Sequence, residues 1–515
     1  MKAINFKNPI IKGFHPDPSI CAVGKNFYLV NSTFSYFPGI PIFHSTDLVH
    51  WKQIGNALTR KSQVDLSNNE DSEGIYAPTI RFHNGLFYII SSNEAHGGVF
   101  IITATNPKGP WSDPTFIKDA DGIDPSLYFE NKKIFYVGTH NNSKGTKFFG
   151  DNEIYLVELN TTTLQFKGKV IPLWNGALRN VVWPEGPHIY KKGGYYYLLI
   201  AEGGTESHHS ITIARSKELT GPYESNPDNP ILTHRNMGNK YNVANVGHGD
   251  FVKAFTNDWY FVCLGSRKCE NVVNTGRETF LGHISWENNW PVLNPGMGIL
   301  EKYGKIFLPE NNISEPRKTI NFSNQKFDNR LLFLRNPKEE KYKFNINGNL
   351  VMKSSNVKLS DLDSPTFIGL RQCSMFGTFE ASFGEIHLLD SELGLTIYQN
   401  HKNNLNFFVK KEKIGYSLNL AKFRDGTNQI LLTKPLNITV NKLIVKQNAQ
   451  QTTFGYVLRN SQDYHWFNIK VDTKFLSTEI AGGFTGCVRG IYISSTSVNT
   501  SDYVELLEFN VSEDQ

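Results

Sequence analysis

One short pattern recurs along the first half of the chain, and it constrains the fold more than any other feature. Each copy begins with a short turn, and 11 or 12 residues after its leading residue comes a tyrosine inside an apolar run. The leading residues are Asp17, Ala77, Asp124, Glu185 and His248, and their tyrosines are Tyr28, Tyr88, Tyr136, Tyr197 and Tyr260. Successive tyrosines lie 60, 48, 61 and 63 residues apart, somewhat longer than common blade or solenoid repeats, which leaves room for loops. The pattern predicts the five blades of a five-bladed β-propeller.

The repeat also predicts where a functional site would lie. Equivalent positions in radially arranged blades lie at the same depth around one central channel. Asp17, Asp124 and Glu185 share one such position, so three carboxyl groups are expected to converge on the axis. A single Asp-Pro-Ser sequence would be an ordinary turn signal. Three acidic residues in one register of the repeat favour a site over that interpretation.

Beyond residue 300 the repeat stops, although strand signals continue. Before that point, runs of β-branched and aromatic residues are bounded by Gly, Pro, Asn and Asp, and no segment keeps helical periodicity. A polar, proline-bounded stretch at 309–316 marks a domain boundary. Alternating segments further on, such as 378–383 and 503–511, predict half-buried antiparallel strands. We therefore predict an all-β chain with a catalytic propeller over 1–308, a linker over 309–321 and a β-sandwich over 322–515.

Composition excludes several partners. The net charge is only +5 over 515 residues, and Lys and Arg are scattered, so no nucleic-acid partner is expected. No membrane partner is expected either, because the longest apolar run, 195–201, is far shorter than the ~20 residues of a spanning helix. The N-terminus has no apolar signal region, which predicts a cytoplasmic protein unless a leader was removed. The five cysteines are odd in number and lack CxxC spacing, so neither a disulfide framework nor a zinc site is indicated.

Several stretches resemble the signature sequences of glycoside hydrolase family 43. In the first domain they are residues 13–19 (Gly-Phe-His-Pro-Asp-Pro-Ser), 38–41, 123–126, 183–187 (Trp-Pro-Glu-Gly-Pro), 202–205, 212–216 and 247–249. In the second domain, residues 394–400 and 483–487 resemble the concanavalin-like, jelly-roll sandwich of the family's β-xylosidases and α-L-arabinofuranosidases. The resemblance covers essentially the whole chain and implies a propeller followed by that sandwich.

The resemblance implies a role for each of the three acids. Cleavage of a glycoside with inversion needs one carboxylic acid and one carboxylate, ~6.5 to 9.5 Å apart, so that water fits between base and sugar. By resemblance, Asp17 is the general base and Glu185 the general acid. Asp124 is the third carboxylate, expected to orient Glu185 and to raise its pKa by like-charge proximity. Partial desolvation beside Trp183 and Pro184 is expected to push the pKa of Glu185 the same way.

The resemblance also implies residues that line a pocket for one sugar. His248 is expected either to touch the sugar or to belong to a water or cation network beneath it. No cofactor is expected to be required, and a structural Ca²⁺ ion in the channel near His248 stays open. Arg277 is expected to hydrogen-bond substrate hydroxyls or Asp124, the alternative being a solvated surface arginine. Phe34 and Tyr76 can stack on a pentose or simply pack against their neighbours.

Two further features bear on specificity. Phe484, from the second domain, is expected to reach over and close the pocket. Tyr76 stands where many xylose-cleaving relatives have tryptophan, which favours arabinose, whereas Ser207 stands where an aromatic residue is expected and leaves its loop undefined. The leading prediction is an inverting exo-α-L-arabinofuranosidase that acts on arabino- or arabinoxylo-oligosaccharides and forms a homo-oligomer, a dimer or tetramer.

Four alternatives remain at this point. The first is a β-D-xylosidase or a bifunctional enzyme, and the second is a carbohydrate-binding propeller without catalysis, which would normally have lost one of the three acids. An endo-arabinanase is disfavoured because a long second domain can block the channel mouth. An invertase-like propeller is disfavoured because residues 16–19 read Pro-Asp-Pro-Ser and not Asn-Asp-Pro-Asn.

Overall fold

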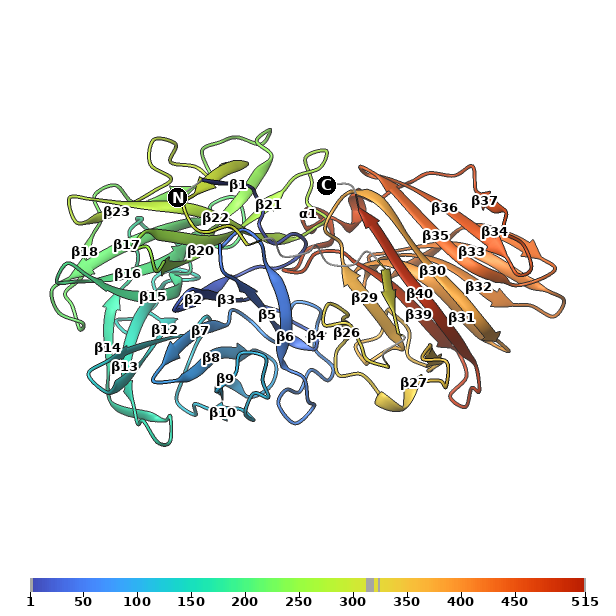
Figure 1. Cartoon of the computed structure of the whole chain (residues 1–515), viewed down its shortest axis with the longest axis horizontal. Coiled ribbons are helices and arrows are strands. Elements are labelled where there is room, and N and C mark those ends of the chain that lie inside the picture. The colour runs from blue at the N-terminus through green and yellow to red at the C-terminus, as the bar shows by residue number, and fades with distance from the viewer. Residues whose placement is uncertain (1–2, 312–318, 323–324, 514–515) are drawn as a thin grey trace.

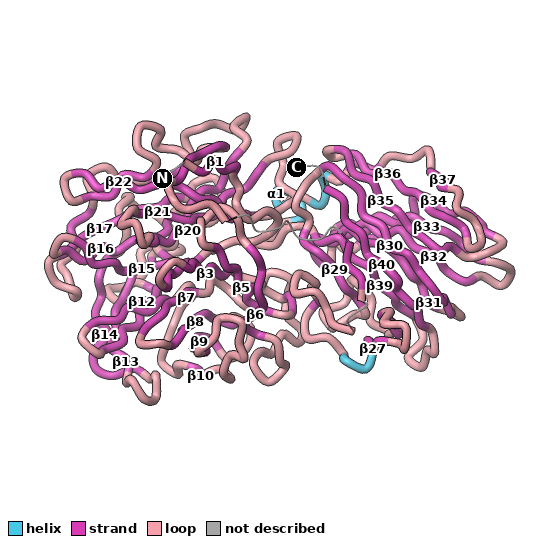
Figure 2. Tube along the Cα trace, viewed as in Figure 1, coloured by secondary structure: helices cyan, strands magenta, loops and turns pink. Residues whose placement is uncertain are grey.

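The computed structural model describes residues 3–311, 319–322 and 325–513, and it places two β domains side by side (Figure 1). Strands dominate both domains (Figure 2). The helices among these residues are one turn long each: η1 (Glu339–Lys341), η2 (Lys474–Leu476) and α1 (Thr478–Ala481). None of them has the length and apolar character needed to cross a bilayer. The predicted all-β class is confirmed, while most of the predicted linker at 309–321 lies outside the described residues.

Within residues 3–311, five antiparallel sheets follow one another along the chain. The first contains β2 (Ser19–Val23), β3 (Asn26–Val30), β5 (Gly39–Ser45) and β6 (Lys52–Leu58). The second contains β7 (Thr79–His83), β8 (Leu86–Asn93), β9 (Gly98–Ala104) and β10 (Thr115–Phe116), and the third β11 (Ser126–Glu130), β12 (Lys133–Asn141), β13 (Asn152–Leu159) and β14 (Phe166–Trp174). The fourth contains β15 (Glu185–Lys192), β16 (Tyr195–Glu202), β17 (Ser210–Ser216), β18 (Glu224–Ser225) and β19 (Leu232–Thr233), and the fifth β20 (Val243–Lys253), β21 (Trp259–Arg267), β22 (Arg277–Glu287) and β23 (Trp290–Leu293). Each repeat of the sequence supplies the first two strands of one sheet.

The first strands of these sheets form a closed ring. β2 packs against β7 and β20, β11 against β7 and β15, and β15 against β20. The ring closes between the first and last sheets, where the Ser19 hydroxyl donates to Asp250 Oδ2 at 2.7 Å. The termini of this domain are joined as well, because β1 (Ile4–Lys7) pairs with β24 (Tyr303–Ile306). Radial sheets of this kind bring their inner ends to one axis.

The second domain is a sandwich of two antiparallel sheets. One contains β27 (Tyr342–Phe344), β28 (Leu350–Lys353), β40 (Tyr503–Glu513), β30 (Phe376–His387), β35 (Val440–Asn448), β36 (Gln451–Leu458) and β37 (Tyr464–Trp466), with β25 (Thr319–Asn321) on β40 and β38 (Val471–Asp472) on β36. The other contains β29 (Phe367–Arg371), β39 (Val488–Ser495), β31 (Ser391–Asn400), β32 (Asn403–Lys411), β33 (Tyr416–Arg424) and β34 (Thr427–Leu436). Alternate residues of β31, such as Leu393 and Leu395, are buried in the core between the sheets, as the period of two requires.

The sandwich packs directly against the propeller, as the position of the last repeat predicts. β4 (Tyr36–Phe37) of the first domain pairs with β26 (Phe333–Leu334) of the second. A buried cluster joins Phe14, Phe34 and Tyr36 to Tyr398 and Tyr492 of the sandwich. The inner end of the first sheet is therefore also part of the domain interface.

Candidate active site

The predicted axial residues lie where the sheets begin. Asp17 and Asp124 each lie two residues before the first strand of their sheet, β2 or β11, and Glu185 is the first residue of β15. His248 lies within β20. Asp17, Asp124 and His248 share a left-handed backbone, with φ of 51°, 53° and 44°. This conformation is uncommon for residues other than glycine and is found preferentially at functional sites.

These residues converge on one another from different sheets. His248 Nδ1 lies 3.8 Å from Asp17 Oδ1 and 3.7 Å from Asp124 Oδ2. Glu185 lies next to this group, because a Cβ on the adjacent Gly186 would come within 3.0 Å of the His248 ring. The strand registers shift between Glu185 and His188 and between Gly247 and Gly249, as in β-bulges, which re-aim side chains near active sites.

Asp17 is held as a carboxylate by an arginine and a serine. Arg277 donates to Asp17 Oδ1 at 2.9 Å and to Thr205 Oγ1 at 2.9 Å, and the Ser32 hydroxyl donates to Asp17 Oδ2. Burial alone would raise the pKa of Asp17, but the guanidinium of Arg277, the nearby His248 and the Ser32 bond outweigh burial and lower it. The expected partners of Arg277 are substrate hydroxyls or Asp124. It is buried, unlike a solvated surface arginine, and its carboxylate partner among the described hydrogen bonds is Asp17, while a bond to substrate stays a prediction.

The pKa values of Glu185 and Asp124 are shifted upward, opposite to that of Asp17. Desolvation by burial, followed by the charge of Asp17, raises the pKa of Glu185 to about 8. Burial, together with the charges of Glu185 and Asp17, raises the pKa of Asp124 well above its usual value. Burial, expected from the position of Glu185 beside Trp183 and Pro184, is the largest cause of the Glu185 shift, and the charge of Asp17 adds to it. The expected repulsion between Asp124 and Glu185 is present as well, and it raises the pKa of Asp124. The site combines a carboxylate, Asp17, whose pKa is lowered, with a carboxylic acid, Glu185, that keeps its proton at neutral pH.

His248 is buried between the two aspartates, and burial lowers its pKa, so the imidazole is neutral at neutral pH. Within the described residues, three potential ligand atoms lie close enough to hold a metal ion at Glu70, Asp71 and His401, which are at the domain interface and not at His248. A structural Ca²⁺ ion near His248 stays a prediction, because Ca²⁺ also takes backbone carbonyls and water as ligands. We derive no chemistry through a metal.

An aromatic wall borders the acids. The rings of Phe34 and Tyr76 have centroids 5.4 Å apart, and the ring of Phe484 lies 5.9 Å from Phe34 and 6.2 Å from Tyr76. Within this wall Phe34 is buried, with 2% of its surface exposed, whereas Phe484 is 37% exposed. Arg277 lies beside this wall and donates to the Phe484 carbonyl at 3.4 Å. The structure therefore brings Phe484 over from the sandwich, as predicted.

Some residues of the site were not identified from the sequence. Ser32 bonds Asp17, Thr205 bonds Arg277, and Ser72 accepts a hydrogen bond from the Phe484 amide at 2.9 Å. Thr205 closes the stretch 202–205 and Ser32 precedes Phe34 by two residues, so both lie beside residues that the sequence did single out. Ser72 carries no such signal.

The chain matches known proteins over its whole length. The model of glycosyl hydrolases family 43 matches residues 6–291, and that of the beta xylosidase C-terminal concanavalin A-like domain matches residues 319–512. The chain is 43% identical over 517 residues to a xylosidase/arabinosidase of Butyrivibrio fibrisolvens, covering 98% of this chain and 99% of that protein. It is 35% identical to a non-reducing end alpha-L-arabinofuranosidase of Bacteroides ovatus, covering 97% and 93%. The crystal structure of a xylan beta-1,4-xylosidase from Bacillus halodurans superposes with a TM-score of 0.92 at 30% identity, covering 99% and 100%.

Proposed function

The chain belongs to glycosyl hydrolases family 43, and from this premise we propose that it is an inverting, exo-acting α-L-arabinofuranosidase. It is a glycoside hydrolase of the xylosidase/arabinosidase group, which acts on oligosaccharides. The proposed substrates are arabino- or arabinoxylo-oligosaccharides with a terminal L-arabinofuranose. The observation that supports a catalytic role most strongly is the convergence of Asp17, Asp124 and Glu185 around His248, in a site that lowers the pKa of Asp17 and raises that of Glu185.

The proposed reaction is a single displacement. Asp17 takes a proton from water as the water oxygen attacks the anomeric carbon, and Glu185 gives its proton to the departing oxygen as the glycosidic bond breaks. Arg277 keeps Asp17 ionised and oriented. Asp124 lies near Asp17 and His248 and is proposed to orient Glu185.

Exo action is supported by the aromatic wall. Phe484 belongs to the sandwich, yet its ring packs against Phe34 and Tyr76 of the propeller. A second domain that closes one side of the site favours a pocket for a terminal sugar over an open groove for a long chain.

We expect the enzyme to cleave nitrophenyl α-L-arabinofuranoside with a kcat/KM about fivefold above that for nitrophenyl β-D-xyloside, since one altered pocket contact is worth about 1 kcal/mol. Tyr76, which forms part of the wall, is the feature that favours arabinose. Tyr76→Trp should shift the ratio toward the xyloside, while the control Tyr76→Phe should leave it unchanged. A xyloside preference in the unaltered enzyme would establish the second candidate, a β-D-xylosidase, which the relative from Bacillus halodurans favours.

The first sugar released should have the anomeric configuration opposite to that of the substrate. Asp17 and Glu185 belong to the first and fourth sheets, and the fifth sheet lies between these two in the ring. Acids on non-adjacent sheets favour a gap wide enough for water. Proton NMR during the first minutes of hydrolysis measures the anomer before mutarotation. Retention would mean carboxyl groups about 5 Å apart and would require new roles for Asp17 and Asp124.

A further inference from the structure

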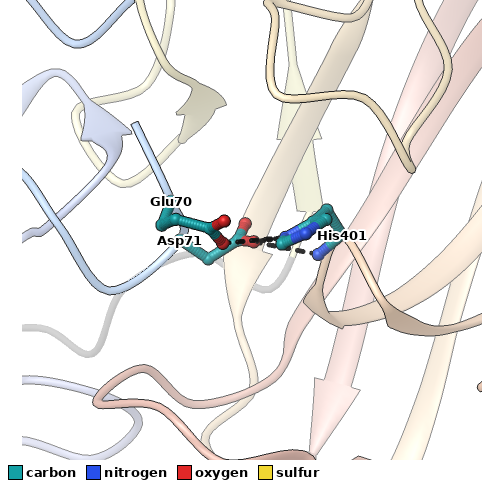
Figure 3. Close-up of side chains that lie close together, drawn as sticks. All are labelled: Glu70, Asp71 and His401. Atoms are coloured by element: carbon teal, nitrogen blue, oxygen red, sulfur yellow. Dashed lines mark hydrogen bonds and ion pairs between the residues drawn. The ribbon is translucent and has the colours of Figure 1, made fainter. Parts of the chain in front are cut away.

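Four consecutive residues at the end of β31, Tyr398, Gln399, Asn400 and His401, contact two separate parts of the molecule, and we call them the clamp segment. On one side they hold Asp71, which lies in the propeller between β6 and β7. The Tyr398 hydroxyl donates to Asp71 Oδ1 at 2.6 Å. The ring Nδ1 and the backbone N–H of His401 donate to Asp71 Oδ2 at 2.6 and 2.9 Å. Figure 3 shows the side chains of Asp71 and His401 pointing toward each other.

Asp71 acts here as an ionised acceptor. It is only 4% exposed, and although burial alone would raise its pKa, the bonds from His401 and Tyr398 and the charge of Arg335 lower it. An ionised carboxylate only accepts, so His401 Nδ1 carries the proton. Glu70 Oε2 lies 3.6 Å from the same nitrogen. The direct bond of 2.6 Å between His401 and Asp71 makes this group a hydrogen-bonded link between the two domains.

On the other side, the clamp segment holds the loop that carries Phe484. Gln399 Nε2 donates to the Thr485 carbonyl at 2.9 Å, and the Thr485 hydroxyl donates to the Gln399 carbonyl at 3.3 Å. Asn400 Nδ2 donates to the Ala481 carbonyl at 3.1 Å. These bonds lie on both sides of Phe484 in the chain.

The two held parts meet beside the aromatic wall. Ser72, the neighbour of Asp71, accepts a hydrogen bond from the Phe484 amide at 2.9 Å. The approach is close, because a Cβ on Gly483, which has a φ of 84°, would lie 2.6 Å from Ser72 Oγ. Phe484 therefore keeps its place only while the loop at Asp71 and the loop at 481–485 stay in register.

We propose that the clamp segment is a positioning element for the sugar pocket, which sets the place of the Phe484 ring by holding both loops at once. The inference rests on the proposed function, since the pocket wall is taken to bind the terminal sugar. Asp17 and Glu185 come from sheets of the propeller, and none of the bonds made by the clamp segment goes to either of them. Loss of the clamp should thus weaken sugar binding more than it slows bond cleavage. The proposal also gives a role to the stretch 394–400, which takes no part in the proposed displacement.

Kinetics of the full-length enzyme test the proposal. His401→Ala and Asp71→Asn should each raise KM for nitrophenyl α-L-arabinofuranoside about tenfold and lower kcat less than about threefold. In Asp71→Asn, the side-chain N–H group would face one of the three donors from which the Asp71 carboxylate now accepts hydrogen bonds. His401→Asn, which keeps a donor near the Nδ1 position, should restore most of the affinity. The control Lys474→Ala removes the exposed Lys474–Glu270 ion pair of 2.9 Å between the same domains and should leave KM unchanged.

Hydrogen exchange gives a second readout that does not need activity. In His401→Ala, the Phe484 amide and the peptide 481–486 should exchange faster than in the unaltered protein, whereas in Lys474→Ala they should not. Unchanged KM and exchange in His401→Ala would overturn the proposal, as would equal effects in Lys474→Ala, which would indicate general loosening of the domains. If the unaltered enzyme cleaved neither nitrophenyl pentoside, the proposed function would fail, and the exchange measurement would still decide the role of the clamp.

Discussion

Glu185→Ala is expected to lower kcat/KM for natural pentose oligosaccharides by about 10³-fold, but for a nitrophenyl glycoside by no more than about tenfold. A general acid contributes most when the departing oxygen is a poor leaving group, and nitrophenolate leaves without a proton. Glu185 suits that role because burial and the charge of Asp17 keep its proton in place at neutral pH. Parallel assays of the two substrates with the variant and the unaltered enzyme measure the difference.

The matched comparison is Asp17→Ala. This variant has no base to activate water, so it should lose nearly all activity on both substrates. Equal losses on both substrates in Glu185→Ala would remove Glu185 from the role of acid.

The pH profile supplies a second check on the same assignment. Asp17 works ionised, so activity should fall at acid pH, below the usual range of a carboxyl group, because its pKa is lowered. Glu185 works protonated, so activity should also fall as pH rises through about 8. With the nitrophenyl substrate, Glu185→Ala should lose the alkaline fall and keep the acid one. An alkaline fall that persists in this variant would have to come from another group.

Removal of residues 317–515 should give insoluble or inactive protein. Phe14, Phe34 and Tyr36 of the propeller are buried against the sandwich, and truncation would expose them as one apolar face. The pocket would also lose Phe484, whose carbonyl accepts a hydrogen bond from Arg277. Soluble yield and kcat/KM of the truncated chain measure the outcome.

Two observations separate the causes of such a loss. If the fragment 317–515, expressed together with the propeller, restores soluble active enzyme, the defect comes from the missing contacts and not from a failure of the propeller to start folding. A truncated propeller that is soluble and fully active would show that neither the interface nor Phe484 is needed.

Predictions that depended on the repeat agreed with the structure for a local reason. Each acidic residue lies in a turn and hairpin of about a dozen residues, so its place at the start of a sheet follows from nearby chain alone. Asp17 and Asp124 even share a backbone conformation, with φ of 51° and 53°. The strands were predictable because alternation of apolar residues with period two is written directly in the sequence.

Predictions that depended on charge and burial agreed with the structure only in part. The partner of Arg277 is 260 residues away at Asp17, and no spacing rule distinguishes Asp17 from Asp124 as that partner. Desolvation of Glu185 is expected from its neighbours Trp183 and Pro184, but that it exceeds the effect of every nearby charge is a property of the packed site. Phe484 contacts Phe34, Tyr76 and Arg277 of the propeller, and the bond from its amide to Ser72 joins residues 412 positions apart.

The sequence by itself determined that the chain is all-β, that its first part is built from a repeat, and that three carboxyl groups occupy one register of that repeat. These properties follow from local periodicity, which acts over one hairpin at a time. Only the tertiary structure decided that Asp17 is ionised, that Glu185 keeps its proton, and that Asp71 of the propeller bonds Tyr398 and His401 of the sandwich. The physical reason is that pKa values and interdomain hydrogen bonds depend on which groups are brought together and shielded from water when distant segments pack.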